Sequence, residues 1–402
     1  MSRISHSVLL AGKEIGSLQQ SHDYVQFHFT DRYWDDPHRH VLGLWFEDHF
    51  ERRVGSNRTL PPWFSNLLPE GRLRDLIAHS RETSVVREME LLAEVGHDLP
   101  GAVTVLDGSG REYPWPAVMD ENQEPGLIVN DSLIKFSLAG VQLKFSMVRD
   151  VDRFTLPASS KTLGHWIVKM PDRSHRGVPE NEFAMMTLAR KIGIDVPEIG
   201  LANRDETIGL PDQAWANGET EAFIIKRFDR VGSNDRVHIE DFAQVRNFRP
   251  DAKYHGSFET VAALAYRAHD QGSLHEFMRR MVLNVVIGNG DAHLKNWSFI
   301  YEDGRNPKLS PAYDIVSTLP YNKNDDLGLK FNDSRRFEDF NLTGVSALEL
   351  KLGVAQDSLV NITKDTMAKI VSKWNPDQTH LTNIEVRDWV SRSIERWEKL
   401  LL

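Results

Sequence analysis

The strongest constraint on the fold of this chain is a helix-forming stretch that runs straight into a polar loop. Apolar side chains recur there at helical spacing: Leu274, Phe277, Met278, Met281, Val282, Val285 and Val286. Such a stripe predicts a helix with one buried face, because methionine and valine in this pattern are usually core residues. Gly288 and Gly290 follow at once and interrupt the helix. The sequence thus predicts a polar loop at the end of a core helix.

Composition limits the class of protein. The 402 residues are 40% hydrophobic, which is enough for a sizeable core and for more than one domain. The absence of cysteine excludes a disulfide scaffold and a thiolate zinc site, and it fits a reducing compartment. A net charge of -10 argues against a chain that coats nucleic acid. We find no apolar run long enough for a membrane span and no secretory signal, so we expect a cytoplasmic protein with no membrane contact.

The first part of the chain predicts a mixed α/β subdomain. Apolar and polar residues alternate, as in residues 24–29, which indicates short antiparallel strands. Two prolines at 61–62 precede a short helical run. We expect a second helix over about 82–94, ended by a left-handed cap at Gly96, and then a strand over 101–106.

The pattern breaks after residue 107, where glycine, proline and acidic residues dominate. This composition is typical of a linker. We therefore expect an N-terminal subdomain over 1–107, a linker over 108–130, a β-rich small lobe over 131–230 and a mostly helical large lobe over 231–402. The predicted fold class is α+β.

The loop after the core helix carries Asp291 and Asn296 at the spacing of a phosphotransferase catalytic loop. The aspartate has to reach an acceptor hydroxyl and take or orient its proton, while the asparagine offers a neutral oxygen to a metal beside the phosphates. The spacing alone is common by chance; its position after a buried helix adds weight. Asp314, which we expect at the end of a short apolar strand, lies where a kinase places its main magnesium ligand. The alternative for Asp314 is a helix cap or turn former.

Upstream segments offer a nucleotide site. Residues 137–144 form a small-residue turn between two predicted strands and end in Lys144. They match neither a Walker loop nor a Gly-x-Gly-x-x-Gly loop, so an ordinary hairpin turn is the alternative. Lys169 lies on an otherwise apolar strand, and a buried lysine needs a partner, which Glu182 on the following predicted helix can supply. The alternative for Lys169 is a surface lysine whose ammonium group reaches solvent.

A crossover between the two lobes is predicted at residues 223–230, where a β-branched strand runs into a charged segment. An adenine ring would hydrogen-bond to backbone groups at such a crossover. Alternatively, Lys226 and Arg227 are simply solvated there.

Together these motifs resemble the HipA family of bacterial serine/threonine kinases, the toxin half of type II toxin–antitoxin modules. Residues 66–71 and 91–98 resemble the N-terminal region of that family. A second set of residues resembles the kinase core of that family. These are residues 137–144, Lys169, 181–182, 227–230, 291–296 and 313–314. The resemblance implies a protein-kinase-like two-lobed core preceded by the N-terminal subdomain.

The resemblance also implies residue roles. Asp291 is the expected catalytic base, Asn296 and Asp314 are the expected Mg²⁺ ligands, and Lys169, paired with Glu182, is the expected phosphate-binding lysine. The residues expected to bind ATP are Ala139, Gly140, Val141, Gln142, Leu143 and Lys144 in the phosphate loop, Lys169, Lys226, Arg227 and Phe228 in the hinge, and His293, Leu294, Lys295, Asn296, Tyr313 and Asp314 around the catalytic loop.

Ser137 occupies the position at which family members autophosphorylate, and a phosphate there would be repelled by those of ATP, which expels the loop. The sequence departs from the family at two positions. Leu143 replaces an acidic residue often found before the loop lysine, and Lys226 replaces a hinge acid.

We therefore expect a cytoplasmic serine/threonine protein kinase that uses ATP and Mg²⁺. By resemblance, its partner is a HipB-like helix-turn-helix antitoxin, through which it meets operator DNA indirectly, and its substrate is a translation component such as an aminoacyl-tRNA synthetase. A small-molecule phosphotransferase shares the catalytic-loop spacing, although the long region before residue 130 argues against it. A non-catalytic corepressor scaffold is the third hypothesis, which the intact set of Lys169, Asp291, Asn296 and Asp314 opposes.

Overall fold

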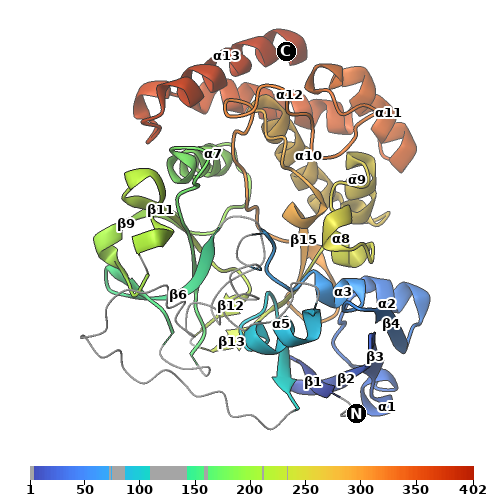
Figure 1. Ribbon diagram of the computed structural model, residues 1–402. Coiled ribbons are helices and arrows are strands. Elements are labelled where there is room, and N and C mark those ends of the chain that lie inside the picture. The colour runs from blue at the N-terminus through green and yellow to red at the C-terminus, as the bar shows by residue number, and fades with distance from the viewer. Residues whose placement is uncertain are drawn as a thin grey trace.

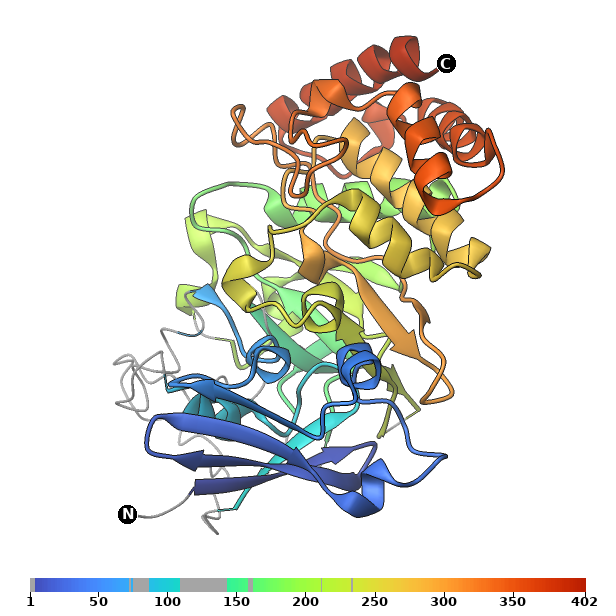
Figure 2. The ribbon, with the colours of Figure 1, turned by 90° about the vertical axis from the view of Figure 1, so that its right-hand side faces the viewer.

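The computed structural model describes residues 4–71, 74, 87–108, 143–157, 162–210, 212–232 and 234–402. An N-terminal sheet lies at one end of the molecule and a group of helices at the other, with a second sheet between them (Figures 1 and 2). The N-terminal sheet and the C-terminus lie at opposite ends (Figure 1). The predicted α+β class is confirmed. Over the described residues, none of the helices combines the length and apolar character that crossing a bilayer requires.

The N-terminal sheet is antiparallel, with strand order β4-β3-β2-β1-β5. Its strands are β1 (Ile4–Leu10), β2 (Lys13–Ser21), β3 (Tyr24–Phe29), β4 (Arg53–Asn57) and β5 (Val103–Asp107). The helices around it are α1 (Asp31–Trp34), α2 (Leu44–His49), α3 (Pro62–Ser65) and α5 (Glu88–Val95). Phe27, Trp63 and Phe64 are fully buried in its core. The predicted antiparallel strands and the short helix after the two prolines are thus confirmed.

Two details of this region differ from the prediction. Helix α5 begins at Glu88, and residues 82–86 of the expected helix lie outside the described residues. Gly96 follows the helix with a right-handed φ of -62°, so the predicted left-handed cap is wrong. The reason for glycine is close packing against β5, because a Cβ at Gly96 would lie 2.7 Å from the Val105 carbonyl oxygen. The expected linker lies outside the described residues from 109 onward.

In the part of the chain that the structure describes, the second sheet has six strands in the order β10-β7-β6-β8-β11-β9. They are β6 (Lys144–Asp150), β7 (Arg153–Thr155), β8 (Trp166–Lys169), β9 (Ile199–Asn203), β10 (Thr207–Ile208) and β11 (Glu221–Lys226). Helix α7 (Val178–Lys191) packs on β11 and β9. The register pairs Lys144 with Lys169 and Lys169 with Phe223. The expected alternation of strands with one clear helix is confirmed for the described part of 131–230.

The C-terminal part is mostly helical, as predicted, but it also contains short strands that the sequence did not reveal. Its helices are α8 (Phe242–Val245), α9 (Phe258–Tyr266), α10 (Gln271–Val286), α11 (Leu342–Leu352), α12 (Ser358–Lys373) and α13 (Ile384–Leu401). Its strands are β12 (Arg230–Val231), β13 (Asp235–Arg236), β14 (His238–Asp241), β15 (Ser298–Tyr301) and β16 (Lys308–Leu309). Helix α10 contacts α9, α12 and α13, and every residue of its predicted apolar stripe is at most 1% exposed.

The predicted short strand ending at Asp314 is wrong. The last strand before it, β16, ends at Leu309, and residues 310–315 belong to no strand. Pro311 has no N–H for a strand ladder. Asp314 has a φ of 55°, which lies in the left-handed region outside the β conformation.

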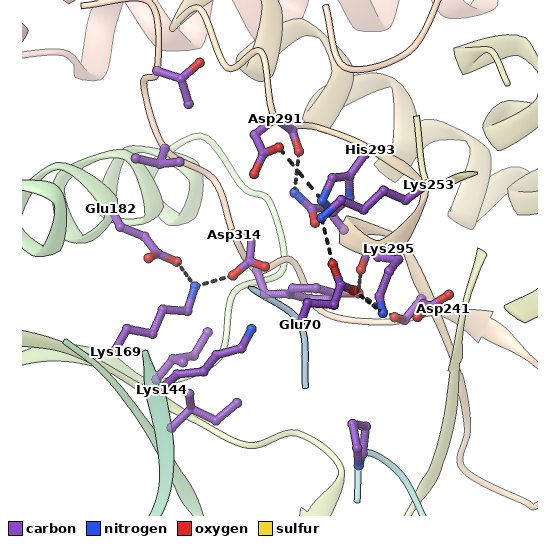
Figure 3. A pocket seen from close by; sticks show the side chains of 18 of the residues that line it. Glu70, Lys144, Lys169, Glu182, Asp241, Lys253, Asp291, His293, Lys295 and Asp314 are labelled. Atoms are coloured by element: carbon purple, nitrogen blue, oxygen red, sulfur yellow. Dashed lines mark hydrogen bonds and ion pairs between the residues drawn. The ribbon is translucent and has the colours of Figure 1, made fainter. Parts of the chain in front are cut away.

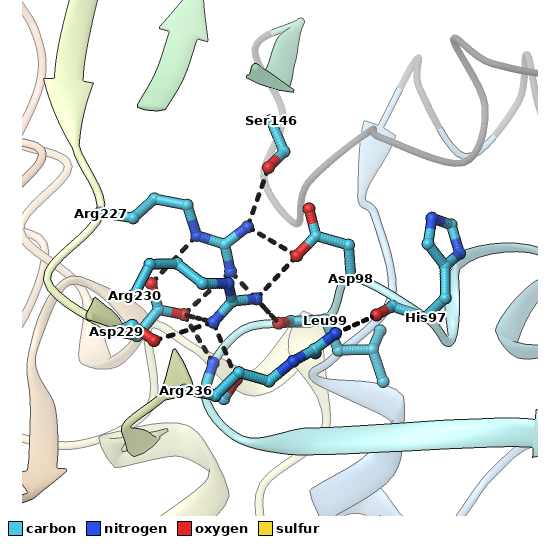
Figure 4. A network of polar contacts seen from close by, with 9 residues as sticks. His97, Asp98, Leu99, Ser146, Arg227, Asp229, Arg230 and Arg236 are labelled. Atoms are coloured by element: carbon cyan, nitrogen blue, oxygen red, sulfur yellow. Dashed lines mark hydrogen bonds and ion pairs between the residues drawn. The ribbon is translucent and has the colours of Figure 1, made fainter. Parts of the chain in front are cut away.

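A buried network of charges joins the N-terminal region to the segment after β11 (Figure 4). Asp98 Oδ1 accepts hydrogen bonds from Arg227 at 3.0 Å and from Arg230 at 2.7 Å, and Asp229 pairs with both arginines at 2.9 Å. All four side chains are at most 6% exposed. Burial alone would raise the pKa of Asp229, but the two guanidinium groups lower it to about 2. The alternative that Arg227 is solvated is therefore wrong, whereas the Lys226 side chain is 52% exposed.

We predict that Asp98→Asn strongly destabilises the protein. The substitution leaves two buried guanidinium groups with one carboxylate, and breaking a buried ion pair typically costs about 3–5 kcal/mol. Urea unfolding at pH 7 measures the loss. As a matched control, Asp31→Asn removes an acid that is 89% exposed beside Arg52, and we expect a loss below about 1 kcal/mol. Equal losses in the two variants would show that the network does not hold the regions together.

Candidate active site

A cavity of about 660 Å³ lies where the N-terminal region, the six-stranded sheet and the helical part meet. Its volume is in the range of small-molecule sites. The residues that line it include Asn66, Glu70, Lys144, Lys169, Glu182, Lys226, Arg227, Phe228, Lys253, Tyr254, Asp291, His293, Lys295, Asn296, Tyr313 and Asp314. Most of the residues singled out from the sequence therefore share one cavity.

One wall carries a lysine between two carboxylates (Figure 3). Lys169 is the last residue of β8, and its Nζ lies 2.5 Å from Oε1 of Glu182 on α7. The same Nζ contacts the Asp314 carboxylate. Lys169 is 4% exposed, so it is not a lysine that reaches solvent. Lys144, its register partner on β6, lies beside it.

Lys169 and Asp314 stabilise each other's charged forms, whereas burial raises the pKa of Glu182. Burial alone would lower the pKa of Lys169, but Asp314 and Glu182 hold it above its usual value, so the ammonium group is charged. Burial alone would raise the pKa of Asp314, but Lys169 and Lys144 hold it well below its usual range. Burial lowers the pKa of Lys144. The wall thus presents the charged ammonium group of Lys169 beside the ionised carboxylate of Asp314.

Part of the loop after α10 is held by its own side chains and by the end of the helix. Gly288 has a φ of 66°, and a Cβ there would clash with the Trp389 ring, which accounts for glycine at this helix end. Asn289 donates from Nδ2 to Asn284 Oδ1 at 2.9 Å and accepts from the Asp291 N–H at 3.0 Å. Asn296 Nδ2 donates to the Asp291 carbonyl at 2.8 Å. The two polar residues of the Asp-x-x-x-x-Asn motif are therefore held together through the backbone.

The Asp291 carboxylate is 52% exposed and belongs to the cavity wall. Tyr254 donates its hydroxyl to Oδ1 of Asp291 at 2.6 Å. His293 Nε2 lies 3.9 Å from the same oxygen. Burial lowers the pKa of His293 to about 4, so the imidazole is neutral at pH 7. The Asp291 carboxylate is thus oriented by a neutral hydroxyl donor.

The donors around Asp314 suit a hard cation. Asn296 commits Nδ2 to the backbone, which leaves Oδ1 as its possible ligand atom. Both Asn296 and Asp314 line the cavity. Within the described ranges, no group of three or more histidine, aspartate or glutamate side chains is arranged to hold a metal. An aspartate and an asparagine completed by phosphate oxygens are nevertheless the kind of ligand set that Mg²⁺ uses.

Several residues predicted to bind ATP do not reach the cavity with their side chains. Leu294 is fully buried in the helical core, and Leu143 packs between the cores of the N-terminal region and the six-stranded sheet. Arg227 lines the cavity but directs its guanidinium into the Asp98 network. The backbone N–H groups of Lys226 and Arg227 donate to the carbonyl oxygens of Glu198 and His165, respectively, both at 2.8 Å. Ser137 and residues 139–142 lie outside the described residues.

The sequence did not identify four residues that shape the site: Glu70, Lys253, Tyr254 and Asn289. Glu70 belonged to a stretch noticed only for its family resemblance. Lys253 and Tyr254 lie between α8 and α9 in no recognisable motif. Asn289 lies between two glycines of the predicted loop, and this position is the only feature of the sequence that points to a role in the site.

We predict that Lys169→Met destabilises the protein at pH 7 by about 3–5 kcal/mol, because two buried carboxylates lose their shared cation. In the wild type, the depressed pKa of Asp314 gives stability that is present above its unfolded pKa and lost on further acidification. In the variant the carboxylates gain stability by protonation, so the difference shrinks toward pH 4. Urea unfolding at both pH values measures this.

The control is Lys308→Met, which removes an exposed lysine paired with Glu302. We expect it to change stability by less than about 1 kcal/mol at either pH. A loss for Lys169→Met that is the same at pH 7 and pH 4 would contradict this account of the charges.

Comparison with known proteins places the chain in a family. The model of the HipA N-terminal domain matches residues 6–106, and that of the HipA-like C-terminal domain matches residues 136–374. A putative kinase, Y4dM, of Sinorhizobium fredii is 38% identical over 384 residues, which cover 93% of this chain and 92% of the relative. The serine/threonine-protein kinase toxin HipA of Shewanella oneidensis is 26% identical over 300 residues, 67% of this chain and 65% of the relative.

A solved structure extends the match to the whole fold. HipA of Shewanella oneidensis MR-1, solved with HipB and operator DNA, superposes with a TM-score of 0.72 over 98% of this chain and 97% of its own, at 21% identity. This likeness confirms the kinase-like two-lobed α+β fold with its additional N-terminal part. With both family models and a relative of nearly full length in agreement, the chain belongs to the HipA family of kinase-like proteins.

Proposed function

We propose that this protein is a serine/threonine protein kinase that uses ATP and Mg²⁺. The observation that carries the proposal is the shared cavity, which is lined by the Lys169–Glu182–Asp314 group and by Asp291 and Asn296. A lysine paired with a glutamate, a carboxylate and an asparagine for the metal, and a catalytic-loop aspartate are the parts that phosphoryl transfer uses. Its family membership adds support, because its relatives include kinases by name.

In this proposal the phosphates of ATP lie beside Lys169 and Lys144, and the adenine lies near Phe228, where the chain crosses between the lobes. Lys169 is held in place by Glu182, so it approaches the phosphates as a fixed cation. When bound, Mg²⁺ would neutralise charge on the phosphates, and Asn296 and Asp314 are the residues that would hold it.

Asp291 would act on the acceptor. Its carboxylate accepts a hydrogen bond from the substrate hydroxyl and takes the proton as the new O–P bond forms and the bond between the β–γ bridging oxygen and the γ-phosphorus breaks. ADP leaves with the electron pair of that bond. Positioning accounts for most of the rate in such a reaction. Tyr254 leaves one carboxylate oxygen available, since it donates to Oδ1 alone.

Regulation and partners extend the proposal. We propose that Ser137 is autophosphorylated, that a HipB-like helix-turn-helix antitoxin neutralises the kinase and connects it to operator DNA, and that the substrate is a translation component in the cytoplasm. We also propose that the chain divides into 1–107, 108–130, 131–230 and 231–402. The relative solved with HipB and operator DNA supports the choice of partner.

The test is a labelling experiment on the full chain. With Mg²⁺ and ATP labelled in the γ-phosphate, we expect label in the wild type and, by mass spectrometry, phosphate on Ser137. Asp291→Asn should lower the rate by roughly 10²–10⁴-fold, which is the range for a lost general base. Asp303→Asn changes an aspartate whose carboxylate accepts hydrogen bonds within its own exposed loop, so the rate should stay unchanged.

The other outcomes distinguish the competing functions. Label on a metabolite with none on any protein would favour a small-molecule phosphotransferase. A wild type that neither incorporates label nor gains thermal stability from ATP with Mg²⁺ would favour a non-catalytic scaffold. Incorporation that persists in Asp291→Asn would remove Asp291 from its proposed role.

A further inference from the structure

We infer that Glu70, which the N-terminal region contributes to the cavity, is a positioning residue that fixes the catalytic loop through Lys295. The inference rests on the proposed kinase function, and it makes the N-terminal region part of the active site. Glu70 does not touch Asp291; its effect passes through two lysines (Figure 3).

The contacts of Glu70 are short and shielded from water. Its Oε1 lies 2.6 Å from Nζ of Lys295, and its Oε2 lies 2.9 Å from Nζ of Lys253. The three side chains are 11%, 8% and 11% exposed, respectively. Ion pairs at an open surface contribute little, but a charge that loses its partner in a buried pair is costly. The ion pairs of Glu70 with Lys295 and Lys253 are therefore buried pairs, in which losing one partner is costly.

The ionisation of Glu70 is set by these neighbours. Burial alone would raise the pKa of its carboxyl, but Lys295 and then Lys253 lower it to about 2. Glu70 is therefore negative at every pH at which the protein would work. One carboxylate holds two ammonium groups that would otherwise repel each other, so removing its charge leaves both lysines without this anchor.

The first route from Glu70 to the chemistry runs through Lys295. This residue precedes the proposed ligand Asn296, whose Nδ2 holds the Asp291 carbonyl. The carbonyl oxygen of Lys295 accepts a hydrogen bond at 2.9 Å from Tyr313, the neighbour of Asp314. Fixing the Lys295 side chain therefore fixes the backbone between the proposed base and both proposed metal ligands.

The second route runs through Lys253. Its carbonyl oxygen accepts from the Leu294 N–H of the catalytic loop at 3.1 Å. The next residue, Tyr254, donates its hydroxyl to the Asp291 carboxylate at 2.6 Å. Both lysines held by Glu70 thus lead to Asp291, one through the backbone of the loop and one through the tyrosine.

The segment that carries Glu70 is itself held in place on both sides. Leu67 and Leu68, just before it, are at most 2% exposed in the N-terminal core. Asn66 donates from Nδ2 to the Phe248 carbonyl at 2.7 Å, and its own carbonyl accepts from Lys295 Nζ at 3.0 Å. Because the segment is fixed at both the N-terminal core and the large lobe, it can transmit a defined position to the loop.

The experiment compares Glu70→Gln with two other variants of the full chain. Glu70→Gln keeps the shape but loses the charge, and we expect kcat to fall by roughly 10–100-fold, the cost of a misplaced reacting group. We expect KM for ATP to change by less than about threefold, since the lysines that face the nucleotide are unchanged. Glu70→Asp, which restores the charge on a shorter side chain, should recover part of kcat.

The matched control is Glu88→Gln. Glu88 is also a buried acid of the N-terminal region, but its partners are Leu60, Ser65 and Arg74 of the same region. This variant should lower the melting temperature yet leave kcat per folded molecule within about twofold of the wild type, since it keeps every contact of the catalytic loop. An effect through folding alone would instead lower kcat in both variants together.

A second readout needs no catalysis. Amide hydrogen exchange over residues 288–297 should be faster in Glu70→Gln than in the wild type and unchanged in Glu88→Gln, because the loop loses an anchor only in the first variant. An inactive wild type would overturn the proposed kinase function, and the exchange result would then decide the positioning role. An active wild type with unchanged kcat and unchanged exchange in Glu70→Gln would overturn the positioning role alone.

Discussion

Two groups of buried charges around the cavity, one at Lys169 and one at Glu70, join separate segments of the chain, and the arrangement of the site depends on this constraint. Lys169 ends a strand and pairs with an acid on α7 and another after β16. Glu70 pairs with two lysines of the large lobe. An unpaired charge at these depths would cost several kcal/mol, so the segments that carry opposite charges must meet. The polar groups of the cavity thereby specify how the lobes and the N-terminal region fit together.

The sequence allowed the local part of this architecture to be predicted. The helical stripe of α10 is a repeat of side chains close in sequence, and Gly288 just after it has a left-handed φ of 66°, a conformation that favours glycine at a helix end. The Asp-x-x-x-x-Asn spacing is local as well, and its residues are held by contacts within the loop. A buried lysine needs a partner, and this requirement predicts Glu182 as the partner of Lys169. The two residues lie thirteen positions apart, with Glu182 on the next helix.

The predictions from sequence fail, or miss a residue, where contacts between distant segments decide the structure. Gly96 is a glycine because β5 passes close to it, and this contact has no periodic signal. Asp314 was placed at a strand end because its neighbours are apolar, whereas its left-handed backbone is compatible with the contact to Lys169. Glu70 was missed as a site residue since its partners lie up to 225 positions later, and a single acid in a loop carries no pattern that names such a partner.

The same constraint argues against regarding the two regions matched by the HipA family models as independent parts. Arg227 and Arg230, after β11, form ion pairs with Asp98 of the N-terminal region. Lys295 forms an ion pair with Glu70 of the same region. Glu240 of β14 accepts hydrogen bonds from the Leu44 N–H at 2.9 Å and from Trp63 Nε1 at 3.2 Å, both N-terminal. Burial raises the pKa of Glu240 to about 7 in spite of these donors, so losing them would make its ionised form still less stable. A C-terminal region alone would retain the motifs of a kinase but would lose one carboxylate of the arginine network, the carboxylate that pairs with Lys295 and two donors to Glu240.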